Sequence, residues 1–305
     1  MPLESSEGGA MRVFQSYHPA VNFVYFACVL GFSMFLLHPV CLAITLLCGA
    51  AYAIVLHGRR AVRFQLAALL PMMVVAAAIN PAFNHAGMTI LGYLPGGNPL
   101  TLESVAYGIA AAVLLAAVIC WFSCFHTVMS SDKFIYLFGA VIPVLSLLLS
   151  MSLRFVPRLK EQARVIANAQ KCVGKNISDG SLWQRARHGM AILSCLVSWT
   201  LENAIDTADS MKSRGYGLPG RTAYSNATFD RRDGLALGCI AVLGGYVLAG
   251  SLLGGLQFRF FPSVKGVELT LYPISIFAAY FALCSLPLGL EVWERHKWKV
   301  IELSM

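Results

Sequence analysis

The segment Ser213-Arg214-Gly215-Tyr216-Gly217 contains the group in this sequence best suited to bind a partner protein. It follows a stretch, about 183–214, whose apolar residues recur every three or four positions and therefore predict an amphipathic helix. An arginine at the end of such a helix presents a planar fork of five N–H donors that matches a partner's carboxylates. Arg214 could equally stabilise the negative end of its own helix dipole. Both interpretations stay open from the residues alone.

Other spacings that could support catalysis or ligand binding are incomplete. Gly174-Lys175 is followed by Asn, not by the Ser or Thr of a phosphate loop, and Ala169 stands where the leading glycine belongs. Cys120 and Cys124 are four residues apart but lack a second pair of ligands. There is also no nucleophile paired with a base. The sequence therefore predicts no catalytic, cofactor or metal site in this chain.

The composition indicates a chain that crosses a membrane several times. Of its 305 residues, 57% are hydrophobic and 12% are charged, and the mean hydropathy is +0.67. A soluble domain carries about 25% charged residues, and a disordered chain needs high charge and low hydrophobicity. Both classes are excluded, and the expected fold class is an all-α polytopic membrane protein.

Five stretches without Asp, Glu, Lys or Arg leave room for six membrane-spanning helices of about 17–25 residues. His38-Pro39 divides the first stretch, because proline disfavours helix at the residue before it. The third span is expected to end at Asn80-Pro81, and Thr101 is a suitable N-cap for the fourth. The predicted spans are about 21–37, 40–56, 64–80, 105–125, 235–256 and 271–290.

The basic residues predict which side of the membrane each loop faces. All of the 23 Lys and Arg residues except Arg259 and Lys265 lie on one side of this topology, most of them within 126–234. By the positive-inside rule that side is the cytoplasm, so both termini of this multi-pass protein of the cell membrane are expected there. The net charge of +8 then follows from topology and gives no reason to expect a nucleic-acid partner.

The apolar segment 134–152 is ambiguous. Its flanks, Lys133 and 154–160, are both basic and belong on the same side, so we expect a segment that does not cross the membrane. The rival interpretation is a seventh span. The expected organisation is four spans in 1–125, a cytoplasmic coupling region in 126–233, two spans in 234–290 and a cytoplasmic tail in 291–305.

The predicted spans contain no Asp, Glu, Lys or Arg. Ion-coupled carriers and intramembrane proteases need ionisable groups within the membrane, so both are disfavoured, whereas a passive channel is less strongly excluded. The spans are rich in small residues, including the spaced pairs Gly234/Gly238 and Gly250/Gly254. These residues either pack helices within the chain or form a smooth surface on which another membrane protein docks.

Two amphipathic helices are predicted in the cytoplasmic region, at about 153–173 and 183–214. Gly174 is a suitable stop for the first, and Ser181 is a suitable N-cap for the second. Their apolar stripes are expected to pack the helices on each other and on 134–152. The first stripe comprises Leu159, Ala163, Ile166 and Ala169/Gln170, and the second comprises Met190, Leu193, Val197, Leu201, Ala204/Ile205, Ala208 and Met211.

Several short motifs, in order along the chain, resemble one family. Leu153-Arg154-Phe155-Val156-Pro157, Glu161, Ala169-Gln170 and Ser213-Arg214-Gly215-Tyr216-Gly217 are similar to the transmembrane T component of energy-coupling factor (ECF) transporters, a group that includes CbiQ-like cobalt permeases. The resemblance is strongest over about 131–217. It implies that Arg154, Pro157, Glu161, Ala169 and Gln170 support the coupling helices.

The resemblance implies a non-catalytic subunit of an importer for a vitamin or a metal ion. In this family, long cytoplasmic helices end in Ala-Arg-Gly-type motifs whose arginines bind two ABC ATPase subunits. A separate membrane S component binds the substrate and reorients when ATP is used. The expected partners are therefore two ATPases, an S component and the lipid bilayer. ATP and Mg²⁺ are expected in the ATPases, and no cofactor is expected in this chain.

The two coupling motifs are not equally matched. Ser213-Arg214-Gly215 fits the second motif, with Ser for Ala, whereas the first falls at Cys172-Val173-Gly174, where Val173 replaces the arginine. Lys171 or Lys175 could make the contact instead, or apolar packing could hold the first ATPase. The alternatives to a coupling subunit are a conventional ABC permease or other carrier with its own substrate path, and a membrane-embedded enzyme.

Overall fold

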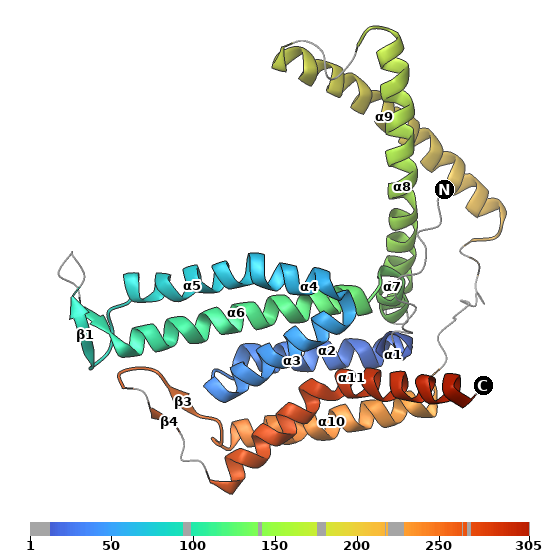
Figure 1. The fold of residues 1–305 in the computed structure, drawn as a ribbon. Helices are drawn as coiled ribbons and strands as arrows, with labels where there is room; N and C mark the ends of the chain where they lie inside the picture. The colour runs from blue at the N-terminus through green and yellow to red at the C-terminus, as the bar shows by residue number, and fades with distance from the viewer. Residues whose placement is uncertain are drawn as a thin grey trace. The chain divides into compact units, whose positions relative to one another are not determined.

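The computed structural model describes residues 13–93, 99–139, 142–175, 181–216, 218, 229–263, 265–266 and 270–304. The chain divides into two compact units (Figure 1). The first, a helical bundle, comprises Met1–Ser130 and Ala227–Met305, and the second, a helical unit, comprises Ser131–Asn226. Helices form most of the described chain, in agreement with the expected all-α polytopic membrane fold.

The bundle is built from helices joined by short turns and two small hairpins. Its helices are α1 (Val13–Ser16), α2 (Pro19–Phe35), α3 (Pro39–His57), α4 (Arg59–Phe64), the π-helix η1 (Gln65–Leu69), α5 (Leu70–Phe83), α6 (Leu102–Val128), α10 (Arg231–Leu252) and α11 (Leu271–Ser304). Two antiparallel hairpins, which the sequence did not predict, are β1 (Ile90–Tyr93) with β2 (Pro99–Thr101) and β3 (Phe258–Arg259) with β4 (Lys265–Gly266). The hairpins lie in the two longer loops that hold few basic residues.

Five of the six predicted spans correspond to helices long and apolar enough to cross a membrane. These are Pro39–His57, Arg59–Phe83, Leu102–Val128, Arg231–Leu252 and Leu271–Val292. The remaining predicted span, which is the first in the chain, corresponds to α2. This helix is apolar but has 17 residues, at the lower end of the usual length range of about 17–25. The predicted breaks at His38-Pro39 and Thr101 are confirmed: His38 caps α3, and the Thr101 hydroxyl accepts the Ser104 N–H.

The predicted end of the third span at Asn80-Pro81 is wrong, because the helix continues to Phe83 with Pro81 inside it. Proline leaves the carbonyl four residues earlier, that of Ala77, without its helical partner. Gly108 of α6 lies against this carbonyl so closely that a Cβ atom there would come within 2.6 Å of the oxygen. The glycine thus lets α6 approach α5 at the point where the α5 ladder is interrupted.

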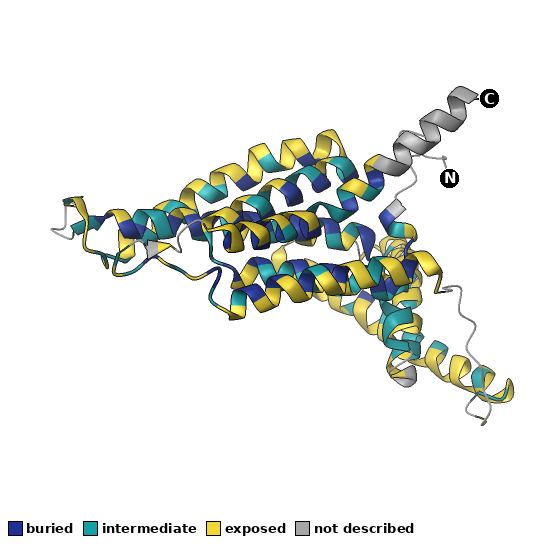
Figure 2. Ribbon diagram, turned by 90° about the horizontal axis from the view of Figure 1, so that it is seen from below, coloured by how far each residue is buried: buried dark blue, intermediate teal, exposed yellow. Residues whose placement is uncertain are grey.

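The bundle core is centred on Trp121 of α6, which is fully buried. Its ring contacts those of Tyr25, Phe26 and Tyr52, and its indole N–H donates to the Thr45 carbonyl at 3.1 Å. The buried donor is therefore satisfied within the core, as an apolar environment requires. In Figure 2 the buried residues of the bundle helices face one another, and many exposed residues lie on the outer faces.

Some of the small residues in the spans lie at close contacts between two helices of this chain. A Cβ at Gly250 in α10 would come within 2.6 Å of Ile276 in α11, so this glycine packs inside the bundle. Its predicted partner Gly254 lies beyond the end of α10, with φ at +83°. The helix ends at Leu252, four residues before the predicted limit of the fifth span. Gly250 and Gly254 therefore do not form a helical docking pair.

The second unit consists of α7 (Ser131–Gly139), α8 (Pro143–Cys172) and α9 (Leu182–Ser213). The segment 134–152 is thus divided between α7 and the start of α8, and the first amphipathic helix begins ten residues before the predicted start at 153. Proline suits the first turn of a helix, where its missing N–H has no partner to lose, and this explains the start at Pro143. The Ser146 hydroxyl donates to the Ile135 carbonyl and links α8 to α7. Burial in α7 lowers the pKa of the Lys133 ammonium.

Candidate functional site at the ends of the crossed helices

The helices α8 and α9 cross near the middle of each, where Phe155 stacks on Trp199 with ring centroids 6.0 Å apart and planes 15° from parallel. The Arg158 guanidinium lies 5.5 Å from the centre of the Trp199 ring, in a cation–π arrangement. The sequence analysis did not single out Trp199. A tryptophan in an otherwise amphipathic helix was the available signal, but its partner is more than 40 positions away in the sequence.

The face of α8 that packs at this crossing is the stripe predicted from the sequence. Leu159, Ala163, Ile166 and Gln170 are half-buried, and the residues between them are mostly exposed. Ala169, the alternative member of the stripe, is exposed. The 3.6-residue period therefore identified the packed face of this helix correctly, as it does when one apolar face has one partner.

The predicted stripe of α9 is not its packed face. Its large members are exposed in the structure: Met190 is 69% exposed, Leu201 61% and Ile205 64%, and Leu193 and Val197 are about half exposed. The packed residues lie on the opposite side of the helix: His188, Ile192, Leu196, Trp199, Thr200 and Asn203. The expectation that both stripes pack the helices on each other is wrong for α9, and an apolar surface remains uncovered by the described residues.

Both helices end in the same backbone arrangement. At the end of α8, the Lys175 N–H donates to the Gln170 carbonyl and the Gly174 N–H donates to that of Lys171, both at 3.0 Å. At the end of α9, the Tyr216 and Gly215 N–H groups donate to the Met211 and Lys212 carbonyls, again at 3.0 Å. This pair of bonds defines the Schellman C-cap, in which glycine takes a left-handed conformation. Gly174 has φ +78° and Gly215 has φ +76°.

This geometry places Val173 and Arg214 at equivalent positions, each the last residue before the left-handed glycine. Both are exposed, and Val173 is 72% exposed, a high value for an aliphatic side chain. Among the described residues, the Arg214 guanidinium has no hydrogen-bond or ion-pair partner. The two predicted motifs thus form the same backbone cap. The residue before the glycine is a cation in one motif and an apolar side chain in the other.

The remaining predicted residues surround these two ends or lie along α8. Lys171, Cys172 and Gly174 are exposed at the first end, and the Ser213 hydroxyl at the second donates to the Ser210 carbonyl at 2.9 Å. Tyr216 is half-buried, and Gly217 lies outside the described residues.

The predicted support residues are mostly exposed along α8. Arg154, Pro157 and Glu161 are exposed. They lie at least eleven residues before the end of α8 at Cys172, so the structure does not place them at that end. Pro157 is inside α8, two residues beyond Phe155, so the helix lacks one backbone hydrogen bond next to the crossing. The Gln170 carbonyl accepts both the Val173 and the Lys175 N–H, so this residue holds the first C-cap.

The described residues of this arrangement present surfaces that a partner protein can bind. Each end presents a rigidly capped side chain, and the α9 face presents exposed apolar surface. Within the described part of the chain, no three His, Cys, Asp or Glu side chains are grouped as metal ligands. A protein partner with carboxylates suits Arg214, and one with an apolar surface suits Val173.

Comparison with known proteins identifies the family. The protein EcfT of Bacillus selenitireducens, an "energy-coupling factor transporter transmembrane protein", is 37% identical over 112 residues, which are 36% of this chain and 42% of that relative. The proteins of the same name from Lactobacillus helveticus and Lactococcus lactis subsp. cremoris are 37% and 38% identical, over 37% and 32% of this chain and 41% and 38% of the relatives. The matched segment thus spans about two fifths of each relative.

A family model covers more of the chain than these relatives do. The CbiQ model, described as "Cobalt transport protein", matches residues 12–224, a range that includes α2 to α9 and both helix ends. This is well over half of the 305 residues. The chain therefore belongs to the CbiQ family.

Proposed function

We propose that this protein is the transmembrane coupling subunit of an ECF-type ABC importer. It passes motion from two ATPase subunits to a separate membrane component that binds a vitamin or a metal ion. The observation that carries the proposal is the pair of crossed helices with matching capped ends. Family membership and the likeness to transmembrane proteins of energy-coupling factor transporters support it.

The dimensions of the crossed helices suit a lever. From Phe155 to the end of α8 there are 17 residues, and from Trp199 to the end of α9 there are 14. At about 1.5 Å per residue the two arms extend roughly 26 Å and 21 Å beyond the crossing. ATPase closure at the ends then turns the helices about the Phe155–Trp199 contact.

The exposed stripe of α9 supplies a surface for the substrate-binding partner. Exposed apolar patches of this kind commonly mark interaction sites. A membrane-embedded partner is itself apolar, and Met190, Leu193, Val197, Leu201 and Ile205 offer it a continuous row along one helix face. In this proposal the row binds the S component and the ends of the helices bind the ATPases, so α9 contacts both kinds of partner.

Co-purification tests the proposal. The full-length protein carrying an affinity tag is expressed at native level, extracted in mild detergent and isolated, and the retained proteins are identified by mass spectrometry. We expect two nucleotide-binding proteins, or two copies of one, and a small hydrophobic protein. Recovery of the chain without nucleotide-binding proteins, together with solute binding or transport by the purified chain alone, would contradict the proposal and favour a carrier with its own substrate path.

A further inference from the structure

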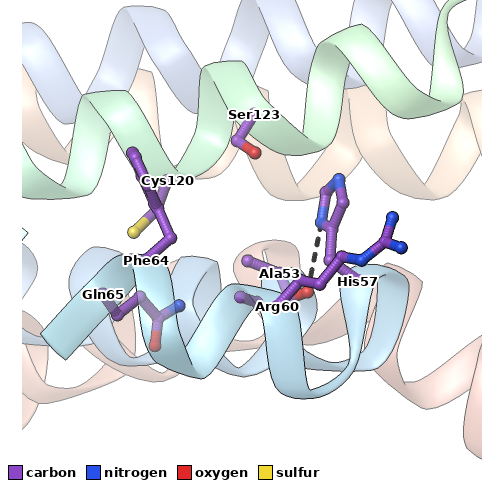
Figure 3. A pocket seen from close by; sticks show the side chains of 8 residues that line it. Ala53, His57, Arg60, Phe64, Gln65, Cys120 and Ser123 are labelled. Atoms are coloured by element: carbon purple, nitrogen blue, oxygen red, sulfur yellow. Dashed lines mark hydrogen bonds between the residues drawn. The ribbon is translucent and has the colours of Figure 1, made fainter. Parts of the chain in front are cut away.

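The bundle contains a pocket that has a cationic side chain at one end and, at the other, a mostly apolar lining that includes the amide of Gln65. Its volume is about 220 Å³, and it lies between α3, the α4–η1 segment and α6 (Figure 3). The lining residues are Ala53, His57, Arg60, Ala61, Phe64, Gln65, Cys120 and Ser123. Figure 3 shows His57 and Arg60 together at one end, and Phe64, Gln65 and Cys120 at the other.

The orientation of the pocket follows from the order of these residues along their helices. His57 is the last residue of α3 and Arg60 is in the first turn of α4, so the polar end lies at the turn where the chain reverses. Gln65 is five residues farther along the Arg59–Phe83 span, about 7.5 Å along the helix axis at roughly 1.5 Å per residue. With the predicted topology, we expect the end with His57 and Arg60 at the membrane surface and the end with Phe64 and Cys120 within the hydrocarbon.

Two of the three strongly polar side chains in the lining already have partners. The Gln65 amide donates to the Ala50 carbonyl at 3.2 Å. The His57 ring lies between two partners: its Nδ1 is 3.3 Å from the Ala53 carbonyl oxygen, and its Nε2 is 2.9 Å from the Thr127 hydroxyl oxygen. Within the described residues, the Arg60 guanidinium has neither an ion pair nor a hydrogen bond.

The short helix α4, which carries Arg60, is strongly cationic. Arg59 and Arg63 flank Arg60 on the same short helix, and the sequence contains no Asp or Glu between Glu7 and Glu103. Neither flanking arginine has an ion-pair partner among the described residues. An anion at this end of the pocket would meet Arg60, the one of these three arginines that lines the pocket, whose charge the described structure leaves uncompensated.

We propose that this pocket binds one anionic phospholipid, with the phosphate at Arg60 and part of an acyl chain against Ala53, Ala61 and Phe64. The volume is below the roughly 300–1,000 Å³ of pockets that enclose a whole small ligand, which suits the end of a longer molecule that lies mostly in the bilayer. Basic pockets between membrane helices at the headgroup level bind anionic lipids in this way. The site is independent of the coupling function.

Native mass spectrometry of the full-length protein in detergent tests the proposal. The protein is titrated with phosphatidylglycerol and, separately, with phosphatidylcholine of the same acyl chains. We expect the anionic lipid to be retained about fivefold more tightly, the effect of one basic group near a lipid surface. Arg60→Gln should abolish this preference, and Arg60→Lys should keep part of it. Equal retention of both lipids by the unaltered protein would overturn the proposal.

Two matched variants separate a built site from general surface charge. Arg63→Gln removes the same charge from the same helix but does not line the pocket, so the preference should persist; an equal loss in both glutamine variants would show that only diffuse charge acts. Ser123→Leu fills the pocket and leaves Arg60 intact, and it should reduce retention of phosphatidylglycerol. Unchanged retention in that variant, or displacement of the lipid by millimolar inorganic phosphate, would contradict the acyl-chain part of the site.

Discussion

The ends of α8 and α9 have the same backbone and different side chains. Each helix stops at a left-handed glycine, with two hydrogen bonds that satisfy the last carbonyls. The residue just before that glycine is Val173 in one helix and Arg214 in the other. The left-handed glycine fixes the backbone conformation at each helix end, whereas the exposed side chain before it takes no part in the cap and can differ. The comparison shows that a common scaffold can present two distinct binding chemistries.

The helices also differ in how they use their apolar faces. The predicted stripe of α8 packs at the crossing, whereas that of α9 is exposed and the opposite face packs. α9 therefore has apolar residues on two sides. One side holds the crossed pair together, and the other remains available to a partner. The two helices are therefore asymmetric, because α9 has both the arginine end and the uncovered surface.

Reversal of the charge at Arg214 should have the largest effect. In Arg214→Glu, the partner's carboxylates would face a like charge, and we expect ATPase retention to be lost. Truncation of one member of a buried charge pair alone costs about 2–5 kcal/mol in binding. Co-purification of the nucleotide-binding proteins measures the loss. Lys212→Glu makes the same charge change two residues earlier and should retain most binding; unimpaired retention in Arg214→Glu would falsify the role of this end.

Substitution on the two faces of α9 should separate folding from binding. Ile192 is 8% exposed on the packed face, and Ile192→Ala should destabilise the crossed pair by about 2–4 kcal/mol through the cavity it leaves. Leu201→Ala on the exposed face should change stability by less than about 0.5 kcal/mol. Thermal unfolding of the purified protein measures both. Equal destabilisation by the two alanine variants would contradict the assignment of faces.

A charge on the exposed face should affect binding. Leu201→Asp should weaken retention of the membrane partner while the ATPases remain.

The two explanations for the first end predict opposite outcomes at Val173. If apolar packing holds the ATPase there, Val173→Asp should weaken its retention by roughly tenfold, since burial of a valine is worth about 1.5 kcal/mol or more. If Lys171 and Lys175 make the contact, the double alanine variant should show the greater loss instead. Quantification of each ATPase by mass spectrometry distinguishes the two explanations.

Modest effects on stability are expected at the capping glycines, where the two ends should behave alike. Gly174→Ala and Gly215→Ala each force a side chain into a left-handed conformation, at a cost of about 1–2 kcal/mol. A Cβ at Gly215 would also lie 3.1 Å from Leu218, whereas nothing lies within 4 Å at Gly174. Gly215→Ala should therefore be slightly more destabilising in thermal unfolding. A cost at one end and none at the other would show that the caps are not equivalent.

Much of the fold was predictable because charge and backbone preferences act locally. Charged residues are costly inside a membrane, so the gaps between them located the spans. The Ser181 hydroxyl accepts the Gln184 N–H as its predicted N-cap, and Gly174 ends α8 as predicted. Errors arose where a distant contact changed a local rule. The helix α5 continues past Pro81 to Phe83, and Gly108 of α6 packs against the carbonyl that Pro81 leaves without a helical partner.

The sequence by itself determined that the chain is a helical membrane protein, in which stretches its spans lie, and which two glycine motifs end α8 and α9. These properties depend on residues close together in the chain. Tertiary structure alone decided which face of α9 is buried. Both faces have apolar residues at helical spacing, and periodicity gives no rule for choosing between them. The stacking of Trp199 on Phe155 selects one face, and the stripe from Met190 to Ile205 is left uncovered by the described chain.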